Sequence, residues 1–173
     1  MRNDGDCRTR ADIHHAGQLR YHRRRNPIAG LLQATDGNLY GTTGGTCSSN
    51  GCGTIFKITP SGTLTTLYTF CSQSGCPDGD DPTAGLVQAA DGALYGTTNR
   101  GGANGNYGTI FKITSSGALT TLYSFCSQSS CTDGKSPYLG GLVQAADGNL
   151  YGTTSLAAPG TSGRSSRSRR LAR

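Results

Sequence analysis

The residues with the most reactive chemistry in this chain are its cysteines. Six of the seven form three pairs with four residues between the members. One pair recurs 55 residues later, whereas another has Gly102 and Tyr107 at its counterpart positions. Joint loss of both members is expected when two thiols bond to each other. Structural zinc sites favour two-residue spacings and four ligands. We therefore favour local disulfides over zinc ligation, and predict Cys47–Cys52, Cys71–Cys76 and Cys126–Cys131. Such bonds imply an oxidising compartment.

An acidic cluster, Asp78, Asp80 and Asp81, has the oxygen chemistry that calcium prefers. Its counterpart at 133–136 lacks two of the carboxylates, so we interpret the cluster as a solvated turn. Residues 27–154 contain neither His nor Glu, so no Ser–His–Asp or Cys–His arrangement can be built there. No phosphate-loop or dinucleotide fingerprint occurs. We predict no catalytic residue, no metal ligand and no cofactor, and hence a protein that is not an enzyme.

The formal net charge of +6 is unevenly distributed along the chain. Residues 27–156 hold four cations against seven Asp, a net charge of −3, and the two ends hold twelve Arg against three Asp. The basic ends lack the interleaved aromatic residues of nucleic-acid-binding arms. All three His lie in the N-terminal end without a ligand spacing. We therefore expect no nucleic-acid partner, and no membrane insertion, because no apolar run approaches the length of a span.

These side chains are carried by an internal repeat. The string GLLQA at 30–34 recurs as GLVQA at 85–89 and 141–145. DGNLYGTT at 36–43 recurs from Asp147 and, as DGALYGTT, from Asp91. GTIFKIT at 53–59 recurs from Gly108. The offset is 55 and then 56 residues. We divide the chain into a basic tail (1–26), a repeat region (27–154, with repeats at about 30–84 and 85–140 and a partial one at 141–154), and an Arg/Ser-rich tail (155–173).

Each repeat predicts four β-strands, at about 31–34, 38–42, 54–59 and 63–70 in the first copy, because these segments are rich in Thr, Ile, Leu, Tyr and Phe. An Asp-Gly pair follows the first strand and predicts a tight type I′ hairpin, in which both central residues have positive φ. The predicted turn-forming residues are Asp36 and Gly37, Asp91 and Gly92, and Asp147 and Gly148.

The strands carry apolar residues on both faces, as Ile55, Phe56 and Ile58 show. This pattern suits a small sheet sandwiched between neighbouring sheets. The sequence therefore predicts an all-β fold of antiparallel four-stranded repeats, resembling β-propeller blades in an incomplete propeller fragment. The alternative is an open β-solenoid or a stack of hairpins.

The same strings resemble the Gloeobacter/Verrucomicrobia-type (GloVer) tandem repeat of bacterial surface proteins, over residues 27–154. The resemblance implies a secreted or surface-attached, propeller-like protein without established chemistry. We expect either a noncatalytic adhesive, spacer or binding scaffold, or a fragment of a propeller enzyme such as a lyase or glycoside-acting enzyme. An enzyme should depart from its repeat at one place, and the copies are nearly identical, which favours the scaffold. Arg100, Lys112 and tyrosines could bind a sugar or peptide, but the ligand is unknown.

Both tails can be read as further repeats translated out of frame. One codon choice for 162–173, shifted by two bases, encodes GTIFKITPSGT, the string of residues 53–63 at the place where the repeat requires it. A shift within 12–25 gives a string that resembles the fourth strand. We therefore expect both tails to pack poorly. We also expect the isolated chain to be weakly stable and to self-associate, because its natural partners are neighbouring repeats.

Overall fold

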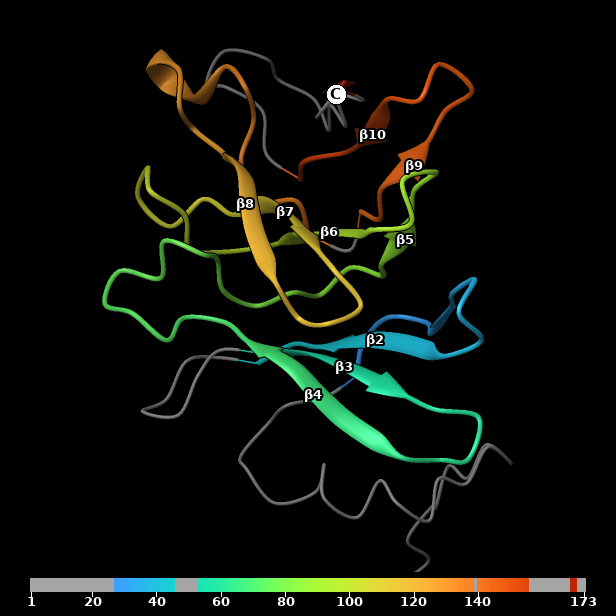
Figure 1. Ribbon diagram of the computed structural model, residues 1–173. Helices are drawn as coiled ribbons and strands as arrows, with labels where there is room; N and C mark the ends of the chain where they lie inside the picture. Colours follow the sequence, from blue (N-terminus) through green and yellow to red (C-terminus); the bar gives the residue numbers. More distant parts are fainter. Residues whose placement is uncertain (1–26, 46–52, 139, 156–168, 171–173) are drawn as a thin grey trace, which may run out of the picture.

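The computed structural model describes residues 27–45, 53–138, 140–155 and the backbone of 169–170. Two four-stranded antiparallel sheets lie one upon the other, and a smaller third sheet follows the second (Figure 1). The strands of the first unit are β1 (Leu32–Gln33), β2 (Leu39–Thr43), β3 (Thr54–Ile58) and β4 (Leu64–Thr69). Those of the second are β5 (Val87–Gln88), β6 (Leu94–Thr98), β7 (Thr109–Ile113) and β8 (Leu119–Ser124). The third unit has β9 (Val143–Gln144), β10 (Leu150–Gly152) and β11 (Arg169–Arg170).

This architecture confirms the predicted all-β class and the antiparallel four-stranded repeats. In the first two units the strand order across the sheet follows the chain, β1-β2-β3-β4 and β5-β6-β7-β8. The strand bounds of the first copy differ from the predicted ones by at most one residue. Within the described residues the helical content is one 3-10 turn, η2 (Ser129–Cys131). None of the described helical segments is long and apolar enough to cross a membrane.

The predicted type I′ hairpin is wrong, because the loop has three residues. Gly37 N–H donates to the Ala34 carbonyl, and Ala34 N–H donates to the Asn38 carbonyl, each across 2.9 Å. Of Asp36 and Gly37, only the glycine has positive φ, at +79°. This geometry is a type I turn followed by a left-handed glycine that forms a bulge. The same pattern of bonds recurs at Gly62, Gly92, Gly117 and Gly148.

The repeated hairpins divide the molecule into two ends. The short turns lie at one end of the sheets, here called the hairpin end, on the right of Figure 1. The long connections, 70–86, 99–108 and 125–138, gather at the opposite end, here called the loop end. Residues of a ligand site carried by loops would therefore meet at the loop end.

Two apolar clusters lie between successive units, and each is built in the same way. The side of each sheet that meets the next unit, its forward face, carries Ala, Tyr, Ile and Phe: Ala34, Tyr40, Ile55 and Phe70 in the first unit, and Ala89, Tyr95, Ile110 and Phe125 in the second. The opposite side, the backward face, carries Leu94, Phe111 and Ile113 in the second unit and Leu142 and Leu150 in the third. A forward face thus packs on the next backward face at both junctions.

One glycine in each complete unit makes room for the phenylalanine of the backward face. A Cβ on Gly96 would lie 2.5 Å from Phe111 Cζ and 2.9 Å from Leu86 Cδ2. Gly41 stands in the same relation to Phe56, also at 2.5 Å. The ring therefore lies over the backbone of the neighbouring strand, which pairs Gly96 with Phe111. Only glycine allows this approach without moving the ring.

A glutamine side chain joins each junction at the hairpin end, and we call this arrangement the glutamine clasp. Gln88 Oε1 accepts from Thr35 N–H of the preceding unit at 2.8 Å, while its Nε2 donates to the Gly92 carbonyl of its own turn at 3.0 Å. Gln144 repeats both bonds, accepting from Ala90 N–H at 2.9 Å. The sequence strings contained this glutamine in every copy, but nothing in them indicated its role.

We predict that Gly96→Ala lowers the free energy of unfolding by roughly 2 kcal/mol, because the added methyl group forces Phe111 out of place. Urea denaturation followed by circular dichroism measures the change. Gly85→Ala is the matched control, since its Cβ would meet nothing closer than Ala29 Cβ at 3.8 Å. Equal stabilities of the two variants would contradict the packing argument.

Candidate binding surface and ionisable groups

An aspartate within each of the connections 70–86 and 125–138 holds the loop end of its sheet. Asp78 accepts from the Tyr68 hydroxyl at 2.8 Å and from Cys71 N–H at 3.1 Å. Asp133, its counterpart, accepts from the Tyr123 hydroxyl and from Ser127 N–H. Burial opposes ionisation of Asp133, but these hydrogen bonds outweigh it and hold its pKa below the usual value. Both carboxylates therefore serve as fixed acceptors that fasten the connection to the last strand.

Asp80 is a buried carboxyl, with 4% of its surface exposed, and this corrects its interpretation as part of a solvated turn. Its backbone pairs with that of Arg100 through two hydrogen bonds of 2.9 and 3.0 Å. Burial raises the pKa of Asp80 to about 6, and the nearby Asp81 adds to the shift, whereas Arg100 opposes it. An acidic triplet looks exposed in a sequence, and only the folded structure shows that this member is buried.

Asp81 joins two units through its side chain. Its Oδ1 accepts from Gly45 N–H at 3.0 Å in the first unit, and its Oδ2 accepts from Asn99 Nδ2 at 3.3 Å in the second. The carboxylates of Asp78, Asp80 and Asp81 thus have different surroundings. Among the described residues, no group of three metal-ligating side chains converges.

At the hairpin end, each predicted turn aspartate accepts from the tyrosine four residues later. The hydroxyls of Tyr40, Tyr95 and Tyr151 donate to Asp36, Asp91 and Asp147 over 2.7 to 2.8 Å. Lys112, on the central strand β7, also donates to Asp91 at 2.8 Å. This lysine and Tyr95 hold the pKa of Asp91 below its usual value. The exposed pair contributes little to stability.

A shallow cavity of about 260 Å³ lies between the second and third units beside Asp91. It is lined by Ala89, Ala90, Asp91, Tyr95, Gln144, Gly148 and Leu150. Its polar groups already serve the turn and the glutamine clasp: Asp91 accepts from Tyr95, from Lys112 and from the N–H of Ala93, and Gln144 accepts from the N–H of Ala90. A carboxylate with a lowered pKa and three donors is a poor general base.

The loop end of the second unit is where the two complete copies differ most in chemistry. Tyr107, Lys135 and Tyr138 stand where the first unit has Cys52, Asp80 and Thr83. Lys135 Nζ lies 5.4 Å from the centre of the Tyr107 ring, a cation–π arrangement.

The backbone keeps these three residues together. Tyr107 carbonyl accepts from Ser136 N–H, and the Ser136 carbonyl accepts from Tyr138 N–H, both at 2.8 Å. Tyr138 is 49% exposed. We call Tyr107, Lys135 and Tyr138 the tyrosine–lysine surface. The sequence carried a signal for it, because these three positions are among those at which the two copies differ, but only the fold brings them together.

Two of the three expected cysteine pairs lie at disulfide distance. The Cα atoms are 4.2 Å apart for Cys71 and Cys76 and 4.1 Å apart for Cys126 and Cys131. All four cysteines have positive φ, between 49° and 61°. The expected pair Cys47–Cys52 lies outside the described residues.

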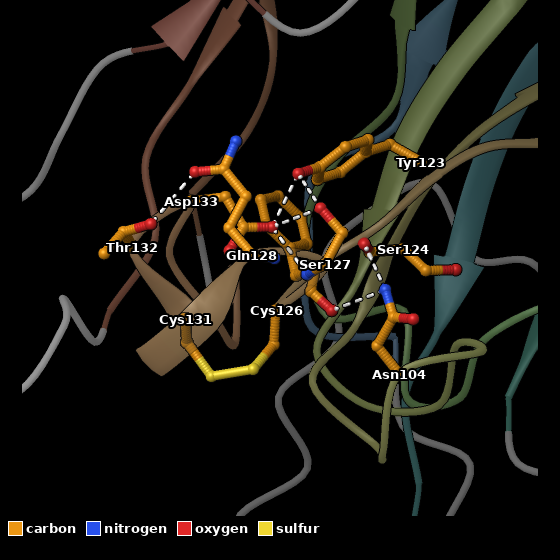
Figure 2. The surroundings of a disulfide bond; sticks show 10 residues. Asn104, Tyr123, Ser124, Cys126, Ser127, Gln128, Cys131, Thr132 and Asp133 are labelled. Carbon is orange, nitrogen blue, oxygen red and sulfur yellow. Dashed lines mark hydrogen bonds between the residues drawn. A yellow bond between two sulfur atoms is a disulfide. The ribbon is translucent and has the colours of Figure 1, made fainter.

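Figure 2 shows the Cys126–Cys131 loop beside the network around Asp133. Tyr123 and Ser127 direct their oxygens at this carboxylate, and Gln128 accepts from Thr132 at 2.9 Å. Asn104 Nδ2 reaches the Ser124 carbonyl at 2.9 Å from the neighbouring loop. Asp133 therefore fastens the cross-linked loop to the last strand, and Asn104 fastens loop 99–108 to the end of the same strand.

We predict that Asp80→Asn stabilises the protein at neutral pH by roughly 2 kcal/mol. The unfolded carboxyl ionises near 3.8 and the folded one near 6. The unfolded state therefore releases its proton first, so the stability of the wild type falls as the pH rises through this window. The variant should lack this fall. Urea denaturation between about pH 4 and pH 8 measures it.

Asp133→Asn provides the control of opposite sign, because hydrogen bonds lower the pKa of Asp133. It should lose stability at neutral pH and approach the wild type as the pH falls. A wild type whose stability is flat between pH 4 and pH 6 would contradict the burial of an ionisable Asp80.

We predict three local disulfides, Cys47–Cys52, Cys71–Cys76 and Cys126–Cys131, after expression in an oxidising compartment. Peptide mapping without reduction should find each linked pair. Replacement of Cys126 and Cys131 together by Ser should cost roughly 2 kcal/mol, because each bond closes a short loop. Free thiols in these pairs, or links between repeats, would contradict the prediction.

Comparison with known proteins places the chain in a family. The model of the Gloeobacter/Verrucomicrobia repeat matches residues 8–165, which contain the whole region of the resemblance. No curated protein matches the chain. A solved structure named "putative gluconolactonase" shares 19% identity at a TM-score of 0.44, over 82% of this chain and 47% of that one. This chain thus spans about half the length of that structure. The chain belongs to the Gloeobacter/Verrucomicrobia repeat family.

Proposed function

We propose that the chain is a noncatalytic, extracellular or cell-surface scaffold that binds a polymeric ligand at its loop end. The sheets would serve as blades of a propeller-like array, and the cross-linked loops would present the binding surface. The observation that carries the proposal is the tyrosine–lysine surface. Tyr107, Lys135 and Tyr138 are among the positions at which the second copy departs from the first, and the fold brings them together at the loop end. Such a departure suits a binding site as well as an enzyme, and the composition of this surface favours binding.

The chemistry of this surface indicates the kind of ligand. An exposed tyrosine offers a flat apolar ring with a polar hydroxyl, and Lys135 adds a positive charge over a second ring. Acidic polysaccharides combine flat apolar sugar faces with carboxylates, so they match both features. Among its described residues, this surface has no nucleophile paired with a base, which supports binding of the ligand over its turnover.

The aspartates of the described chain have structural hydrogen-bond partners, which supports the same proposal. The turn aspartates accept from tyrosine hydroxyls and from backbone N–H groups, and Asp78 and Asp133 hold connections. The pKa of Asp80 is near 6, which would suit acid–base chemistry, but this residue is only 4% exposed and therefore out of reach of a polymer. The cysteine pairs are compatible with an oxidising compartment.

We predict that polygalacturonate in a native gel retards the oxidised 173-residue chain and that starch does not. Lys135→Gln and Tyr138→Ala should each weaken the retardation about 3-fold or more, since an exposed cation–π or ring contact contributes up to about 1 kcal/mol. Lys112→Gln is the matched control, because it removes an equal charge at the hairpin end.

The same polymer tests the enzyme alternative. The chain should release no reducing ends and no unsaturated sugar products from polygalacturonate. Turnover of the polymer would overturn the noncatalytic reading. Absence of retardation by either polymer, or equal effects of the Lys135 and Lys112 variants, would overturn the proposed surface.

A further inference from the structure

The two junctions between units have the same contacts, and this equivalence identifies a third interaction surface. In each junction a forward face packs on a backward face, and a glutamine of the later unit accepts from a turn N–H of the earlier unit. The two donors, Thr35 and Ala90, occupy equivalent places in the repeat, and Ala146 is the third such residue. Gln33 is in turn the first of the three glutamines.

Exposure shows which faces remain uncovered. Leu31 is 44% exposed, whereas its counterparts Leu86 and Leu142 pack into the two inter-unit clusters. Val143 is 60% exposed, whereas its counterparts Leu32 and Val87 pack into the same clusters. Large exposed apolar side chains at positions that are otherwise buried mark a surface for association.

The remaining residues of the third forward face follow the same trend. Ala145 and Tyr151 are only partly buried, whereas Ala34, Ala89, Tyr40 and Tyr95 are buried. Gln33 and Ala146, the residues that would complete another glutamine clasp, are both exposed. One face thus offers Val143 with the N–H of Ala146, and the other offers Leu31 with the amide of Gln33.

We propose that these two faces bind each other between copies of the chain, so that the protein associates head to tail. The partner is a second copy of the chain. The exposed forward face of one copy has the same residue types as the two forward faces that already pack on backward faces within the molecule, and the exposed backward face of another copy has the types that fit it. The contact is heterologous: the forward face of one copy meets the backward face of the next. Such contacts extend into filaments unless the rotation closes a ring. This association is independent of the ligand proposed for the loop end.

A capping experiment tests the arrangement. Leu31→Asp should block the backward face and Val143→Asp the forward face, and both positions are exposed, so neither charge is buried on folding. Sedimentation of the wild type up to roughly 100 µM should show association that grows with concentration. Each single variant should remain monomeric, whereas an equimolar mixture should form a 1:1 dimer and stop there.

Two controls keep the test decisive. Ser115→Asp adds the same charge at an exposed turn and should associate like the wild type. Ala146→Pro removes only the N–H of the clasp, at a turn position that favours proline, and should weaken association about 5-fold. A monomeric wild type would overturn the proposal. So would dimers of either single capped variant, which would show a symmetric contact instead.

Discussion

A four-stranded sheet of this size cannot cover its own apolar faces, and this constraint governs the rest of the molecule. Ile110 and Phe111 are neighbours on one strand, and because successive side chains of a strand point to opposite faces, they bury into different inter-unit clusters. Each unit therefore depends on the unit before it and on the unit after it. The glycine opposite each phenylalanine, the glutamine clasp and the bridging Asp81 all serve this stacking.

The turns show how far the sequence determined the fold. The strings repeated at 55 and 56 residues placed the strands of the first copy to within one residue, because side-chain pattern and turn residues agree in every copy. They did not determine the hairpin geometry. An Asp-Gly pair suits a two-residue loop, and it equally suits the last two positions of a three-residue loop. The hydrogen bond from Gly37 N–H to the Ala34 carbonyl shows that the loop has three residues. The choice depends on the register between β1 and β2.

The ionisable groups were harder to place, for a different physical reason. Asp78, Asp80 and Asp81 are adjacent in sequence and similar in type, yet one holds a strand end, one is buried and one joins two units. Their hydrogen-bond partners lie 7 to 36 positions away in the sequence. Likewise, Tyr107 and Lys135 become a pair only because the third and fourth strands of the unit bring both connections to one end. Neither the surroundings of these aspartates nor the pairing of Tyr107 with Lys135 can be predicted from the residues next to them in the sequence.

The glutamine clasp also bears on how such a chain can lengthen. Each clasp joins a donor on the turn of one unit to an acceptor on the first strand of the next. The second unit has both, the acceptor Gln88 and the donor Ala90, so one repeat carries what it needs for the junctions on its two sides. A gene duplication of one repeat would insert a unit that fits its neighbours at once, with no compensating change on either side. Copy number can then vary between relatives while the architecture of each unit stays the same, and single copies are left to diverge at the loop end.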